Sequence, residues 1–258
     1  MCNSVWSAVQ LNDKEVVSHK VGSLTIYLKK ILNEVWFAES CDETANEASI
    51  SLQEELEWTR VALPETYDRF VFSPVMPDRS VVVDTDYVYR IYPGSNARVY
   101  CKIPVFVRIS PESNPDMVVA EIPTAILSGT WFGVFTEGEL SYALSSTVRR
   151  ILEKEQFEPH LAVCPIEIQN TSDSDLKFEK ICLKTERLSI YIHDDIMWTD
   201  ETKITNHSKE SDSVVEMKGE LPMEAKGGRL LTAPRSPYRK SFANRTFRLL
   251  RDLNFTGL

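Results

Sequence analysis

Long apolar runs, paired cysteines and a secretory leader are all missing from this 258-residue chain. No stretch approaches the roughly 18 to 20 apolar residues that a membrane-spanning helix needs. Residues 1–20 lack a basic region followed by an apolar one, so no secretory signal is expected. The five cysteines are widely spaced and form no CxxC pair, which argues against a zinc site or a disulfide framework. We therefore expect a cytoplasmic protein with reduced thiols.

Motifs for catalysis and nucleotide binding are also absent. The chain has no GxSxG, GxxxxGK[ST], GxGxxG or HExxH sequence, so we predict no catalytic residue, no cofactor and no metal site. One segment leaves two interpretations open. His193-Asp194-Asp195, with Asp200-Glu201, has the clustered carboxylates that a hard cation prefers. An Asp-Asp pair at a hairpin tip is also ordinary turn chemistry, and we favour the turn.

The residues that are present indicate a folded protein with an uneven charge. Hydrophobic residues make up 43% of the chain and aromatic residues 10%, which is enough for a sizeable core. Residues 225–258 contain eight basic residues and one acidic residue, a net charge of +7, within a chain of net charge −9. Residues 1–224 therefore carry −16. Because an acidic body repels polyanions at long range, we expect no nucleic-acid partner.

Short β-rich runs separated by polar turns predict an all-β protein. We expect hairpins over residues 23–38, 87–109 and 160–192. Counting outward from the turns places Tyr89 opposite Tyr100 in the second hairpin and Cys164 opposite Cys182 in the third. The turn-rich sequence S-P-E-S-N-P-D at residues 110–116 suggests two packed β-sandwich-like halves, residues 1–112 and 113–233.

Two helices are predicted outside this pattern. One is short, over Ser146–Lys154. The other is a basic amphipathic helix over Pro237–Leu253, within a tail formed by residues 234–258. At 100° per residue its apolar residues share one arc, and the opposite arc holds the basic residues. We expect the tail to dock on the acidic body, and the alternative is contact with a partner or an anionic membrane through Arg239, Lys240, Arg245, Arg248 and Arg251.

The segment Gly129–Gly138 is the most unusual in the chain, because it places three of the nine glycines among Trp131, Phe132 and Phe135. Two interpretations remain open. A core strand with glycine kinks would bury the aromatics, and we favour this for Trp131 itself. A binding site would expose them, because glycines allow close backbone approach and exposed aromatics anchor partners. Its candidate residues are Gly129, Trp131, Phe132, Gly133 and Glu137, with Arg149 and Arg150 downstream for an anionic group.

Four segments together resemble a known family. They are G-T-W-F-G-x-x-T-E-G-E-L-x-Y-A-L from Gly129, P-H-L-A-V-C-P-I-E-I-Q-N from Pro159, E-R-L-S-I-Y from Glu186 and W-T-D-E from Trp198. This order resembles an uncharacterised prokaryotic family, domain of unknown function number 432, over roughly Trp58 to Asn206. The family has no assigned activity and no catalytic residues to carry over. Some members look to be encoded beside small-conductance mechanosensitive channels, and this implies a cytoplasmic accessory role.

The leading hypothesis is a non-enzymatic binding or regulatory module that acts on a protein partner, such as a membrane channel. The alternative is a hydrolase or carbohydrate-active enzyme on a β-sandwich, with Glu137, Glu139 and Asp200 as its acid and base residues. Two of these carboxylates converging in one pocket, within roughly 5 to 10 Å, would favour the enzyme. Carboxylates scattered over loops would favour the binding module.

Overall fold

The computed structural model describes residues 5–41, 56–133, 138–152, 157–207, 212–236, 242–245 and 247–248. Over these residues the chain is almost entirely β, as predicted, and its only helical elements are two single turns of 3-10 helix, η2 (Thr185–Arg187) and η3 (Met223–Ala225). Within the described part of the chain, no helix has the length and apolar character needed to cross a membrane.

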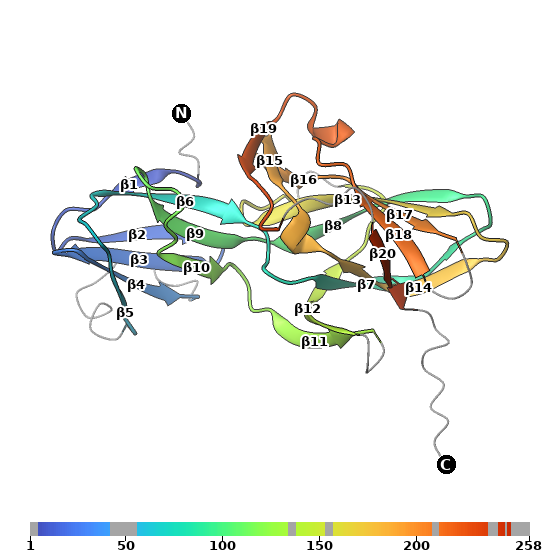
Figure 1. Ribbon diagram of the computed structural model, residues 1–258, viewed down its shortest axis with the longest axis horizontal. Helices are drawn as coiled ribbons and strands as arrows, with labels where there is room; N and C mark the ends of the chain where they lie inside the picture. The colour runs from blue at the N-terminus through green and yellow to red at the C-terminus, as the bar shows by residue number, and fades with distance from the viewer. Residues whose placement is uncertain are drawn as a thin grey trace, which may run out of the picture. The chain divides into compact units, whose positions relative to one another are not determined.

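The chain forms two compact units that interleave along the sequence (Figure 1). The first unit contains Met1–Val75, Val105–Ile126 and Glu158–His160. The second contains Met76–Pro104, Leu127–Phe157 and Leu161–Leu258. These units are defined by contacts between Cα atoms and combine segments from different parts of the chain. The predicted division into domains of residues 1–112 and 113–233 stays a prediction.

The first unit has two four-stranded antiparallel sheets. Sheet A has the order β1-β6-β9-β10, with strands Ala8–Gln10, Arg69–Val75, Phe106–Pro111 and Ala120–Pro123. Sheet B has the order β2-β3-β4-β5, with strands Val16–Val21, Leu24–Ile31, Glu34–Ser40 and Thr59–Ala62. Apolar residues from both sheets share one buried core, for example Ile26 and Leu28 of β3 with Phe70 and Phe72 of β6.

The first predicted hairpin is confirmed. Strands β3 and β4 pair antiparallel from Ile31 opposite Glu34 to Thr25 opposite Ser40. Leu32 lies in the connecting turn with a φ of 58°, a left-handed conformation that a tight two-residue turn requires. The turn is local and the apolar alternation is strong, so the sequence alone determines this pairing.

The second unit has two larger sheets. Sheet C has the order β11-β12-β7-β14-β21, with strands Ser128–Phe132, Glu139–Thr147, Val81–Ile91, Leu176–Leu183 and Phe247–Arg248. Sheet D has the order β19-β15-β16-β13-β17-β18-β20, with β8 (Asn96–Pro104) also paired to β13. Its other strands are Arg229–Thr232, Ile190–His193, Ile196–Thr199, Leu161–Asn170, Thr202–Asn206, Asp212–Met217 and Phe242–Arg245.

The second and third predicted hairpins are wrong, although their turns lie where the sequence places them. Strand β7 belongs to sheet C and β8 to sheet D, and in the same way β13 belongs to sheet D and β14 to sheet C. Each turn therefore crosses between sheets. The buried side chain of Asn170 holds both crossings together, because its Nδ2 donates to the carbonyl oxygens of Ile91, at 2.9 Å, and Ser174, at 2.8 Å.

The predicted residue pairs change accordingly. Tyr89 lies opposite Phe178, with the two rings stacked at a centroid distance of 5.3 Å, and Tyr100 lies opposite Pro165. Cys164 is the cross-strand neighbour of Cys101 and not of Cys182, which lies opposite Val82. All three of these cysteines are buried free thiols. Hydrogen bonding with Cys164, together with burial, raises the pKa of Cys101, so this thiol stays protonated.

Neither predicted helix is present in the described residues. Strand β12 continues to Thr147, and Arg149 then forms an isolated bridge to Tyr100, so residues 146–152 are not helical. In the tail, β20 pairs with β18 (Figure 1). Strand β21 pairs with β14. Open sheet edges at β18 and β14 offer backbone partners, and this tertiary pairing overrides the helical period. The rest of Pro237–Leu253 lies outside the described residues.

Candidate functional site

The glycine- and tryptophan-rich segment forms an antiparallel hairpin at the edge of sheet C. Strand β11 pairs with β12, with Trp131 opposite Leu140 and Phe132 opposite Glu139. Strand β11 ends the order of its sheet, and its outer edge has no neighbour among the described strands. Gly133 follows β11 with a φ of 112°, a conformation that favours glycine. The predicted residue Glu137 lies outside the described residues.

The two aromatic residues of β11 have different environments because they lie on opposite faces of the strand. Phe132 is buried and packs with Val82 and Cys182. Trp131 is 50% exposed and its cross-strand neighbour Leu140 is 51% exposed. The core interpretation therefore holds for Phe132 and is wrong for Trp131. An apolar pair of this size at a sheet edge is available for contact with another molecule.

Gly138 has a direct role in placing the Trp131 ring. A Cβ atom built on Gly138 would lie 2.2 Å from Nε1 of Trp131 and 2.8 Å from the carbonyl oxygen of Phe132. Only glycine leaves room for the indole at this point. Gly138 therefore allows the Trp131 ring to pack against the β11–β12 hairpin. The sequence alone does not reveal this contact, because it depends on the register between β11 and β12.

Arg149 and Arg150 lie at the other end of β12. Both are exposed, and the backbone of Arg149 pairs with Tyr100 through N–H···O distances of 2.8 and 2.7 Å. From Leu140 to Thr147, β12 spans roughly 23 Å at the usual rise of a strand. The structure thus places the arginines and Trp131 near opposite ends of one strand and does not bring them together into one site.

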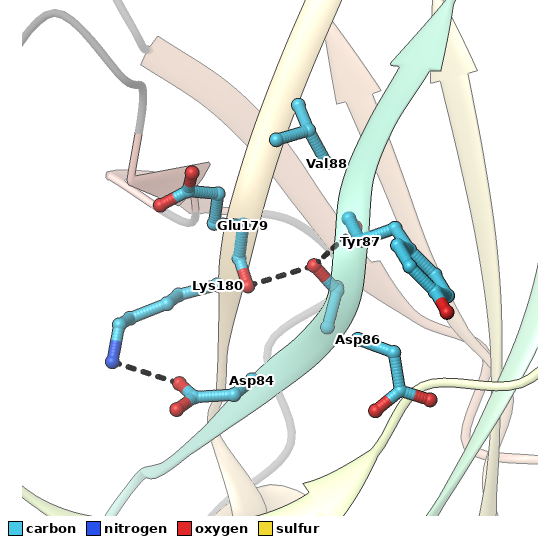
Figure 2. Close-up of a pocket in the computed structure, with 7 residues that line it drawn as sticks. Asp84, Asp86, Tyr87, Val88, Glu179 and Lys180 are labelled. Carbon is cyan, nitrogen blue, oxygen red and sulfur yellow. Dashed lines mark hydrogen bonds and ion pairs between the residues drawn. The ribbon is translucent and has the colours of Figure 1, made fainter.

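A bulge in the middle strand of sheet C creates a pocket (Figure 2). Asp84 lies opposite Lys180 and Tyr89 opposite Phe178, so residues 85–88 of β7 face the single residue Glu179 of β14. The Thr85 hydroxyl lies 2.7 Å from the carbonyl oxygen of Tyr87 and 3.0 Å from that of Glu179, and it holds the bulge against β14. Bulges of this kind redirect side chains next to functional sites.

The pocket has a volume of about 400 Å³ and a mainly acidic lining. Asp84, Asp86 and Glu179 supply carboxylates, and the single cation of the lining, Lys180, pairs with Asp84 at 2.8 Å. Tyr87 is 83% exposed beside them. Nothing in the sequence indicated this pocket, because the bulge depends on the register between two strands that are far apart in the chain.

A charge cluster on β8 and its neighbours links five side chains of the second unit. The Arg98 guanidinium donates to Glu201 at 2.6 Å and to both carboxylate oxygens of Glu224 at 2.9 Å. The Tyr100 hydroxyl donates to Glu224 at 2.6 Å, and Lys218 pairs with Glu201. Glu224 belongs to η3, so the network fixes this short turn to sheet D.

Both carboxyl groups of this network are held ionised. Burial opposes ionisation, but hydrogen bonds from Lys218 and Arg98 outweigh it and lower the pKa of Glu201. In the same way, hydrogen bonds from Arg98 and Tyr100 outweigh burial and lower the pKa of Glu224. Each of the two carboxylates has a cationic partner within the protein, so the cluster acts as a structural clamp.

Two of the three acid and base residues of the enzyme hypothesis, Asp200 and Glu139, are engaged by other groups of the protein, and the third, Glu137, lies outside the described residues. Asp200 is fully buried and accepts hydrogen bonds from the backbone N–H of Ser189, at 2.5 Å, and the hydroxyl of Tyr191, at 3.0 Å. Burial raises the pKa of Asp200, although these hydrogen bonds oppose the rise. Glu139 lies in sheet C and pairs with Lys184. The two carboxylates therefore share no partner.

The turn interpretation of His193-Asp194-Asp195 is confirmed. The turn joins β15 to β16, and Asp194 and Asp195 have φ values of 49° and 60°, as expected for a tight hairpin turn. Across the described residues, no group of three or more His, Cys, Asp or Glu side chains is placed to hold a metal ion.

Of the basic tail residues, Arg245 and Arg248 lie in β20 and β21, whereas Arg239, Lys240 and Arg251 lie outside the described residues.

The fold and these sites define an all-β protein with several sheets, an apolar hairpin at one sheet edge and an acidic pocket at a strand bulge. The chain belongs to the family described as "Protein of unknown function (DUF432)", whose model matches residues 5–251. The resemblance seen in the sequence is therefore confirmed, and the match is longer than the segment that carried it. No curated protein matches the chain. No solved structure matches it either.

Proposed function

We propose that this protein is a non-enzymatic binding module that engages a protein partner through the β11–β12 hairpin. The observation that carries the proposal is the cross-strand pair of Trp131 and Leu140, half exposed on a strand at the edge of its sheet. Tryptophan is strongly enriched among residues that dominate binding energy, because its large, rigid surface is buried at low entropic cost. The hairpin is held to sheet C by Phe132, so the contact surface has a firm base.

The finer parts of the proposal rest on the sequence. Packing of the sheets as two sandwich-like bodies is predicted from the pattern of short strands and turns. The cytoplasmic location is predicted from the lack of a secretory signal and from the unpaired cysteines, and the membrane channel is what the family resemblance implies. The enzyme alternative has less support, because the carboxylates of Asp200, Glu201 and Glu224 are engaged in hydrogen bonds and ion pairs within the protein. A buried carboxylate already engaged by fixed donors is poorly placed to exchange protons with a substrate.

The proposal predicts a position-specific cross-link in cells that make the protein naturally. A photoreactive phenylalanine analogue in place of Leu140 should give one dominant adduct with a protein partner on illumination. The same analogue in place of Leu32, which is 76% exposed in the first unit, is the matched control and should give no such adduct. Equal adducts from both positions, or none from position 140, would contradict the proposal.

A further inference from the structure

The edge strands of the four sheets differ in how they are protected from pairing with other chains. Natural edge strands are usually shielded by charged residues or proline, because their outer N–H and C=O groups are ready to pair. In the described part of the chain, seven edge strands carry such residues: Lys20 in β2, Arg60 in β5, Arg98 and Lys102 in β8, Glu121 and Pro123 in β10, Arg229 in β19, Arg245 in β20 and Arg248 in β21. Strand β1 is uncharged but has only three residues.

Strand β11 is the exception among the longer edges. Its five residues, Ser-Gly-Thr-Trp-Phe, include no charge and no proline. The strand therefore lacks the usual protection over its whole length, and it also carries the half-exposed Trp131. An unshielded edge of this kind is open to pairing with a strand of another chain.

The sequence of β11 is complementary to itself in one antiparallel register. If Thr130 of one copy lies opposite Thr130 of another, Trp131 lies opposite Gly129 and Phe132 lies opposite Ser128. Each large residue then meets a small one on both faces of the joined sheet. Threonine pairs are favourable across antiparallel strands, and an aromatic ring beside a glycine covers the backbone that the glycine leaves open.

The space around Gly129 fits this register. Among the described residues, the only atom within 4 Å of a Cβ built on Gly129, apart from its chain neighbours, is Cδ1 of Leu140 at 3.9 Å. The surface above Gly129 is thus open on the face of β11 that carries Trp131 and Leu140. An indole from a second copy would lie against the open backbone at Gly129.

We propose that two copies of this chain associate by antiparallel pairing of their β11 strands, with the twofold axis at Thr130, so that their two sheets C become one. This inference goes beyond the proposed function, although it uses the same hairpin. Pairing occupies the outer backbone edge of β11, whereas the heterologous partner contacts side chains on one face. The dimer would present two Leu140 side chains and the flanking indoles on the same face of a continuous sheet.

Sedimentation velocity over a range of protein concentrations tests the association. Experiments at physiological salt limit the repulsion between two copies of net charge −9. We expect a monomer–dimer equilibrium, weak because five residue pairs form a small interface. Thr130→Lys places two like charges together at the axis and should weaken dimerisation by more than about 10-fold. Leu230→Lys on the edge strand β19 is the matched control and should leave it unchanged.

A cysteine scan tests the register independently of these charges. In a chain with Cys2→Ser and Cys41→Ser, Thr130→Cys should form a disulfide-linked dimer under mild oxidation, because residues at the axis lie within disulfide reach. Gly129→Cys should not form this disulfide, since its partner across the axis is Trp131.

Three results would overturn the inference. They are a full chain that stays monomeric at all concentrations, a dimer unaffected by Thr130→Lys, and equal cross-linking of both cysteine variants. A retained cross-link from position 140 in the Thr130→Lys chain would show that the proposed function survives that failure.

Discussion

Replacement of Arg98 by alanine should lower the free energy of unfolding by about 3 kcal/mol at neutral pH. Arg98 is the common partner of Glu201 and Glu224, which it contacts at 2.6 and 2.9 Å. Its removal leaves Glu224 with Tyr100 as its remaining side-chain partner, and it leaves Glu201 with Lys218. A partly buried carboxylate that loses its arginine partner keeps its desolvation cost with less compensation. Urea denaturation of the full chain measures the change.

The same variant should show a defined pH dependence. The pKa values of Glu201 and Glu224 are lowered in the folded protein from the ordinary value of 4.5. Their pairing therefore stabilises the native protein above about pH 4.5, and this contribution is lost as the pH falls through the folded pKa values. In the Arg98→Ala chain this pairing is lost, so the difference from the parent chain should be largest above about pH 4.5 and should shrink as the pH falls below that value.

Arg90→Ala provides the control for the Arg98 prediction. Arg90 forms an ion pair with Asp175, but its side chain is 53% exposed. Surface pairs of this kind contribute about 0 to 1 kcal/mol, so this variant should unfold almost as the parent does. Equal stability losses for the two arginine variants, or an Arg98→Ala penalty that grows on acidification, would show that the cluster is not a clamp.

A chain ending at Ser236 should be less stable than the full chain by about 1 to 6 kcal/mol. Truncation removes four residue pairs between β18 and β20 and two between β14 and β21, and cross-strand pairs contribute about 0.2 to 1 kcal/mol each. It also exposes one edge of sheet C and one of sheet D. Thermal unfolding followed by circular dichroism in the far ultraviolet measures the loss.

A chain ending at Arg248 is the matched control for the truncation, because it keeps β20 and β21 and removes only residues 249–258. It should unfold at nearly the temperature of the full chain. The pairing of both strands with the body supports docking of the tail over the alternative of membrane contact. If the chain ending at Ser236 is as stable as the full chain and differs only in binding to anionic vesicles, the tail is a targeting element and the structural role is wrong.

The sequence predicted the local part of the fold well. The turn at Leu32-Asn33 and the turn at Asp194-Asp195 each join strands that pair with each other, because a two-residue turn leaves the chain no other choice. At the turns near Gly94 and Ser174, the sequence did not reveal that the two strands joined by each turn belong to different sheets. Their strands have apolar residues suited to either sheet, and the choice depends on the buried Asn170, whose partners lie on both sides of the crossings.

The C-terminal segment shows why a helical period misled. The spacing of Phe242, Leu249 and Leu253 fits an amphipathic helix, but residues 242–245 and 247–248 are strands. Two sheets of the body end in open edges there, and hydrogen bonding to those edges decides the backbone conformation. Periodicity in one short segment carries no information about edges supplied by strands earlier in the chain.

The candidate sites were predictable to different degrees. The glycine-rich spacing identified the β11–β12 hairpin, although burial of Phe132 and exposure of Trp131 could be assigned only from the strand register. Arg98 and Glu224 are 126 residues apart in sequence, so no motif could have joined them. The pocket beside Tyr87 depends on a bulge that appears only when β7 pairs with β14.

The most direct test of the central claim is a Trp131→Ala substitution in the chain that carries the photoreactive group at position 140. Removal of a central tryptophan from an interface typically costs about 2 kcal/mol or more, so the adduct yield should fall by more than about 10-fold. Because Trp131 is 50% exposed, the free energy of unfolding should fall by only about 1 kcal/mol. An unchanged adduct yield in a stably folded variant would contradict the assignment of this hairpin as the binding surface.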